Sequence, residues 1–261
     1  MFKRFSICYI LFMFCITGTS AQEDRWTGNA TNLSKGNLRV NSSGRYLEYS
    51  DGTPFLYMGD TAWELISRLN DKETELYLEN RREKGFTVIQ TVILDELDDM
   101  DVSSNGEPKL IDGNIDKPAP GYFTHVDKVI SLAAAKGLYI ALLPTWGDKV
   151  DKQWGKGPEI FTPENAYRYG KWLGERYMNA PNLIWIIGGD RSGDGKNFAI
   201  WNALATGIKS VDKNHLMTYH PHGEHSSSSG FTMLRGWILI CVNPDTHNKI
   251  SQSINVCFCP I

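Results

Sequence analysis

Short apolar segments and longer amphipathic segments alternate along this chain. The apolar segments with strand-like composition are 55–58, 86–94, 138–146, 182–187 and 216–219. The segments in which apolar positions recur at helical spacing are 71–84, 122–136, 162–178 and 197–211. Strands that are almost continuously apolar are typical of a parallel sheet covered by helices. The pattern therefore predicts a series of five β/α units.

A β-hairpin is expected ahead of these units. Residues 38–40 and 46–49 alternate between apolar and polar positions, and the segment 41–44 between them ends in Gly44, which favours a turn. The hairpin and the five units together would form one domain over residues 37–229, after a polar leader at 22–36.

Two α/β folds contain such a series of units, the (β/α)8 TIM barrel and the doubly wound sheet. No Gly-x-Gly-x-x-Gly motif follows the first expected strand, and the sequence contains no phosphate-binding loop. We therefore expect the first five β/α units of a TIM-type barrel. In such a barrel the chemistry lies at the carboxyl ends of the strands.

Polar and aromatic residues gather at the expected strand ends. In chain order they are Asp60, Trp63, Asp95, Glu96, Trp146, Asp148, Asp190, His220, His222 and Glu224. Gln90 points from within the second expected strand. Asp95 and Glu96 begin an acidic run, which we interpret as a solvated loop. A calcium site there would need oxygen ligands at ordered spacing, which the run lacks.

Charge and aromatic content narrow the range of partners. A net charge of -3 at pH 7 provides no basic surface, which excludes nucleic acid as the expected ligand. The 261 residues include 8 Trp, and flat aromatic rings favour ligands such as sugars. We expect carbohydrate as the partner and no cofactor.

The amino terminus has the layout of a signal peptide. Lys3 and Arg4 precede the apolar run 5–16, and small residues at 19–21 predict cleavage near Ala21. We expect a secreted or periplasmic protein with residues 1–21 as signal peptide, and no membrane partner after cleavage. Cys8 and Cys15 lie in this segment, and the next cysteine is Cys241, so no disulfide framework is expected.

Three ordered motifs carry a resemblance to a known family. They are Gly-Asp-Thr-Ala-Trp at 59–63, Ile-Trp-Ile-Ile-Gly-Gly-Asp at 184–190 and His-Pro-His-Gly-Glu-His-Ser-Ser-Ser at 220–228. With them the segment 38–229 resembles the apiosidase-like (β/α)8 glycoside hydrolases, glycoside hydrolase family 140 and relatives. The resemblance implies retaining cleavage of glycosidic bonds in plant polysaccharides. It also implies a carboxylic acid/base after the fourth strand, which maps onto Asp190, and a carboxylate nucleophile near the seventh strand, which maps onto no residue here.

The remaining candidates are expected to bind substrate. Trp63 and Trp146 offer aromatic faces for sugar rings, and Asp60 can accept hydrogen bonds from hydroxyls. The other predicted substrate-binding residues are Gln90, His220, His222 and Glu224.

The segment 230–261 has no strand–helix rhythm, although a closed barrel needs three more β/α units. One permitted back-translation of 230–246, started one nucleotide earlier, reads through to Gln-Ser-Gly-His and resembles the family. This predicts a frameshift near Ser229, an out-of-frame tail at 230–261, and a chain that lacks the nucleophile and is inactive.

Two alternatives remain open. A His-x-His pair, His220 and His222, would suit a metal-dependent hydrolase, but the sequence offers no further ligands on other strands, since His125 and His215 lie in or beside helices. We therefore predict no metal. The other alternative is a carbohydrate-binding remnant without catalysis.

Overall fold

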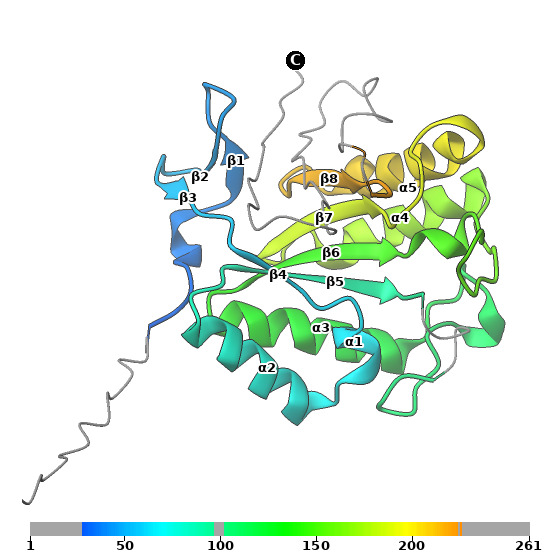
Figure 1. Cartoon of the computed structure of the whole chain (residues 1–261), viewed down its shortest axis with the longest axis horizontal. Helices are drawn as coiled ribbons and strands as arrows, with labels where there is room; N and C mark the ends of the chain where they lie inside the picture. Colours follow the sequence, from blue (N-terminus) through cyan, green and yellow to red (C-terminus); the bar gives the residue numbers. More distant parts are fainter. Residues whose placement is uncertain (1–27, 97–101, 224, 226–261) are drawn as a thin grey trace, which may run out of the picture.

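The computed structural model describes residues 28–96, 102–223 and 225 (Figure 1). The predicted signal peptide 1–21, residues 22–27 of the leader, Glu224 and the predicted out-of-frame tail lie outside the described residues.

A five-stranded parallel sheet forms the centre of the fold. Its strands are β4 (Gly59–Thr61), β5 (Val88–Leu94), β6 (Tyr139–Thr145), β7 (Leu183–Gly188) and β8 (Met217–His220). They lie side by side in chain order, and each pairs in parallel with the next. This order is that of successive units in a (β/α)8 barrel, and it confirms the predicted fold class.

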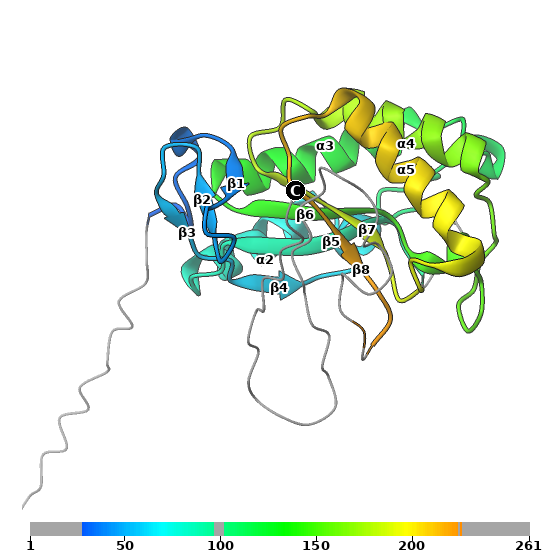
Figure 2. The same cartoon turned by 90° about the horizontal axis from the view of Figure 1, so that it is seen from above.

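The α-helices connect these strands. They are α1 (Leu65–Arg68), α2 (Asp71–Glu83), α3 (Pro120–Ala135), α4 (Pro163–Tyr177) and α5 (Phe198–Val211). Short 3-10 helices are Leu33–Lys35, Ile111–Gly113, Gly147–Lys149 and Gly195–Asn197. Figure 2 shows α3, α4 and α5 on one side of the sheet.

Local sequence signals fix where two of the helices begin. Asn70 caps α2 and forms a reciprocal capping box with Glu73, and Thr162 does the same for α4 with Asn165. These caps explain why both predicted starts were correct to within a residue.

A small antiparallel sheet lies at the amino ends of the parallel strands (Figure 1). Its strands are β1 (Leu38–Val40), β2 (Leu47–Tyr49) and β3 (Pro54–Phe55). Leu38, Leu47 and Phe55 pack there with inward-facing residues of the large sheet such as Val88 and Tyr139. The predicted hairpin is therefore confirmed, and it closes one end of the inner face.

The prediction that 55–58 forms the first parallel strand is wrong. Phe55 is buried and pairs with Leu47 in the small sheet, whereas Leu56 and Met58 are exposed. The first parallel strand is β4, which pairs with β5 from Gly59 to Thr61. Asp60 therefore lies within a strand rather than after one.

Candidate functional site at the carboxyl ends of the strands

Asp190 follows β7 after a turn in which positions 188 and 189 have backbone angles that favour glycine. Gly188 and Gly189 have φ of 105° and 125°, and Asp190 itself has φ of 54°. A Cβ on Gly188 would lie 2.4 Å from the carbonyl oxygen of His220, and a Cβ on Gly189 would lie 2.8 Å from the amide nitrogen of Gly147. The two glycines thus allow the ends of β6, β7 and β8 to meet closely, with the Asp190 side chain at their junction.

His220 lies directly beside Asp190. Its Nδ1 is 3.5 Å from Oδ1 of the carboxylate, and the imidazole is buried while the Asp190 side chain is 39% exposed. Burial lowers the pKa of His220, although the negative charge of Asp190 opposes that shift. A neutral imidazole is therefore favoured at the edge of the carboxylate.

Two tryptophans enclose this imidazole. The ring centroid of His220 is 5.4 Å from that of Trp63 and 5.6 Å from that of Trp146. The two indoles are themselves 5.2 Å apart. The structure thus brings together four of the predicted site residues, since His220 contacts Asp190 and the two indoles contact His220.

Glu96 and Asp148 add negative charge near Asp190. Burial and the charges of Asp148 and Asp190 raise the pKa of Glu96, and Arg191 and Lys149 partly offset this shift. Asp148 is fully buried, and its Oδ2 accepts hydrogen bonds from Lys149 Nζ at 2.9 Å and from the Gly157 amide at 2.8 Å. Several carboxyl groups therefore converge on the carboxyl ends of β5, β6 and β7.

Asp60 and Gln90 lie apart from this cluster. The Asp60 carboxylate accepts hydrogen bonds from Tyr77 Oη, at 2.6 Å, and from Arg81 Nε, so helix α2 holds it. Gln90 lies between Val88 and Val92 along β5 and shares their inner face, where it is buried. The structure does not bring these two residues to Asp190, and their predicted contact with substrate stays a prediction.

His222 lies beyond the end of β8. Its ring centroid is 4.2 Å from that of His225. Within the described ranges, no group of three or more His, Cys, Asp or Glu side chains is placed to hold a metal ion.

The solvated-loop interpretation of the acidic run is wrong for Asp95. Asp95 is 1% exposed, and its Oδ2 accepts a hydrogen bond from Lys109 Nζ at 2.8 Å. Lys109 is also fully buried. The sequence carried no signal for this pair, because the two residues are separated by a connection without a regular repeat.

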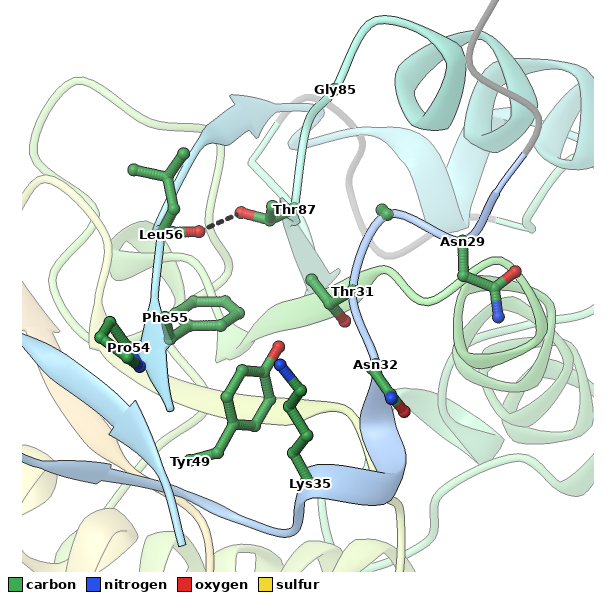
Figure 3. A pocket seen from close by; sticks show the side chains of 11 residues that line it. Asn29, Thr31, Asn32, Lys35, Tyr49, Pro54, Phe55, Leu56, Gly85 and Thr87 are labelled. Carbon is green, nitrogen blue, oxygen red and sulfur yellow. Dashed lines mark hydrogen bonds between the residues drawn. The ribbon is translucent and has the colours of Figure 1, made fainter. Parts of the chain in front are cut away.

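An open pocket lies at the opposite end of the molecule. Figure 3 shows its lining, which includes Asn32, Lys35, Tyr49, Phe55 and Thr87. These residues come from the amino-terminal segment, the small sheet and the start of β5, so the pocket shares no residue with the cluster around Asp190.

The parallel β/α sheet and its polar carboxyl edge define the class as a TIM-type α/β domain with a carboxylate-containing site. The comparisons with known proteins identify the family. The apiosidase-like catalytic domain matches residues 41–256, and the chain belongs to that family. The matched range runs past Ser229, where the sequence predicts a frameshift; that frameshift stays a prediction.

Solved structures of glycoside hydrolases are similar to the chain. One described as a glycoside hydrolase shares 39% identity with a TM-score of 0.74, over 88% of this chain and 51% of that one. A glycoside hydrolase family 5 protein from Bacteroides vulgatus shares 34% identity with a TM-score of 0.74, over 85% of this chain and 46% of that one. The chain thus spans about half the length of these two relatives.

An endo-1,4-beta-mannanase from Rhizomucor miehei is similar in fold alone. It shares 16% identity with a TM-score of 0.54, over 78% of this chain and 70% of that one. None of the curated proteins compared with the chain is significantly similar to it. In the described part of the chain, no helix has the length and apolar character needed to cross a membrane.

Proposed function

We propose that this chain is part of a secreted glycoside hydrolase that cleaves glycosidic bonds in plant-type polysaccharides, with Asp190 as the general acid/base. The observation that carries the proposal is the position of Asp190. It lies at the carboxyl end of β7, half-exposed, beside a buried imidazole and two indoles. A group in this place can reach a glycosidic oxygen and still exchange protons with water.

In a retaining mechanism Asp190 would act twice. It first donates its proton to the leaving glycosidic oxygen while a carboxylate nucleophile attacks the anomeric carbon and forms a glycosyl ester. It then takes a proton from the water molecule that breaks this ester. The described residues include five parallel strands, and the resemblance implies a nucleophile near the seventh, so we assign the nucleophile to none of them.

Three side chains around Asp190 support this role. The His220 imidazole lies beside the carboxylate, and Trp63, which is partly exposed, offers an apolar surface for a sugar ring, whereas Trp146 is buried and packs against Trp63. Substrate contacts by His222 and Glu224 belong to the same proposal.

A change of reading frame near Ser229 is the second part of the proposal. Its support is the alternative reading of 230–246, which ends in Gln-Ser-Gly-His. Sequencing the source DNA across codons 225–246 and beyond tests it directly. An indel, or an open frame that continues after Gln-Ser-Gly-His, would support it, and a single frame without such a continuation would refute it.

Catalysis by Asp190 is tested in a frame-restored chain, in which the proposed reading-frame change near Ser229 has been repaired. Substrates would be pectin, arabinoxylan, galactomannan and xyloglucan, together with 4-nitrophenyl glycosides of their sugars. Asp190→Asn should lower kcat/KM for natural substrates far more than kcat/KM for nitrophenyl glycosides, because kcat/KM reports the first step and nitrophenolate leaves in that step without needing a proton. Equal losses on both kinds of substrate would argue against a general acid, and binding without turnover in either chain would favour the carbohydrate-binding alternative.

A further inference from the structure

Trp154 is an exposed aromatic side chain near the proposed catalytic site. It lies in the connection between β6 and α4 and is 66% exposed. The guanidinium carbon of Arg191 lies 4.4 Å from the centroid of its ring. Arg191 directly follows Asp190 in the sequence. One face of the indole is therefore covered by a cation next to the proposed acid/base, and most of the rest faces solvent.

Arg191 also holds the loop that carries this ring. Its side chain is fully buried, and its Nε and Nη2 donate hydrogen bonds to the carbonyl oxygens of Asp151, at 2.5 Å, and Lys152, at 2.8 Å. Further along the loop, Lys149 Nζ donates to the Gly157 carbonyl oxygen at 2.6 Å. The loop is thus tied at both sides of Trp154, so a ligand would not have to order it on binding.

A carboxylate lies next to the same loop. A Cβ on Gly155, the neighbour of Trp154, would lie 3.1 Å from Oε1 of Glu96. Glu96 is only partly buried, and within the described part of the chain its carboxylate accepts no hydrogen bond. The loop that carries the exposed Trp154 ring and the Glu96 carboxylate, a hydrogen-bond acceptor, therefore lie together at the carboxyl ends of β5 and β6.

We propose that Trp154 and Glu96 form a sugar-binding subsite beside Asp190, for a unit of the polysaccharide other than the ones joined by the cleaved bond. The C–H groups on one face of a pyranose or furanose ring are apolar and slightly positive, which matches the electron-rich face of an indole. Hydroxyl groups at the rim of the same ring can donate to the Glu96 carboxylate. This inference rests on the proposed function, because it assumes a carbohydrate ligand.

Affinity electrophoresis of the full chain tests the subsite without requiring turnover. The gels would contain pectin, arabinoxylan, galactomannan or xyloglucan, and retardation gives a dissociation constant for each. We expect Trp154→Ala to weaken binding to the retarding polysaccharide about 10-fold, Trp154→Phe to retain most of it, and Glu96→Gln to weaken it about 3-fold. Tyr46→Ala is the matched control, because Tyr46 is a 41% exposed aromatic residue beside the small sheet.

A second measurement uses the unaltered chain, in case Trp154→Ala does not fold. Hydroxyl-radical footprinting with mass spectrometry reports oxidation of Trp154 with and without the bound polysaccharide. The subsite predicts strong protection of Trp154 and none of Tyr46.

The outcomes separate this inference from the proposed function. Retardation that all variants share, with Trp154 oxidised equally in both states, would overturn the subsite and leave a carbohydrate-binding protein. A chain that no polysaccharide retards would also overturn the subsite, and the role of Asp190 would then be judged by hydrolysis in the frame-restored chain alone.

Discussion

The Nδ1 of His220 lies 3.5 Å from Oδ1 of Asp190, and this contact joins the last residue of β8 to the turn that ends β7. The imidazole is enclosed by two indoles, whereas the carboxylate reaches toward solvent. The ring of His220 is therefore held in place by its packing against Trp63 and Trp146.

Folding stability should depend on pH through His220. Since burial lowers the pKa of His220 below the usual value of about 6.5, the unfolded chain binds a proton at pH values where the folded chain does not. Stability is therefore lost as pH falls from about 6.5 toward the lowered pKa of the folded state. Urea unfolding from pH 7.5 to pH 5 should show this loss, and His220→Phe should reduce it.

The matched control for this measurement is His222→Phe, which changes a histidine outside the indole cluster. It should keep the slope of the unaltered chain. The same slope in His220→Phe as in the unaltered chain would contradict the assignment.

Gly188 should tolerate no side chain. Gly188→Ala adds a Cβ at φ 105° and 2.4 Å from the His220 carbonyl oxygen, so both backbone strain and a steric clash oppose folding. We expect a loss of about 3 kcal/mol in the free energy of unfolding, measured by urea titration. Gly52→Ala has φ 89° and no atom within 4 Å of the added Cβ, so it should cost only about 1 kcal/mol. Similar losses in both variants would show that the close approach of β7 and β8 is unimportant.

The buried pair of Lys109 and Asp95 should contribute strongly to stability. Lys109→Met leaves Asp95 charged and buried, which should cost about 3 to 5 kcal/mol. Arg168→Ala breaks an exposed ion pair with Asp116 and should cost less than about 1 kcal/mol. Adding Asp95→Leu to Lys109→Met should recover much of the loss. Denaturant unfolding distinguishes these cases, and a small effect of Lys109→Met would mean that water reaches the pair.

Residues with a local signal could be predicted from the sequence. Strands β5, β6 and β7 are long and mostly apolar, and every residue in them is buried. Asn70 and Thr162 accept hydrogen bonds from helix amides close in sequence. The turn at 188–190 could also be foreseen, because two glycines between a strand and an acidic residue allow an unusual backbone.

Features that depend on tertiary contacts could not be predicted. Strand β4 contains Gly59, Asp60 and Thr61, which have no apolar pattern. It forms because its backbone pairs in parallel with the edge of β5. The partners of Asp60 lie one helical turn apart on α2, and the Trp154–Arg191 contact joins residues 37 positions apart. No pattern of neighbouring positions reports such pairs, so the sequence identified Asp190 and its aromatic surroundings but missed the loop beside them.

Asp190 as the acid/base of a glycoside hydrolase is tested most directly by reducing-sugar release from the frame-restored chain with and without Asp190→Asn. We expect hydrolysis of at least one plant polysaccharide, and a kcat lowered about 100-fold or more in Asp190→Asn with little change in binding. An Asp190→Asn variant that releases sugar at the rate of the unaltered protein would contradict the claim.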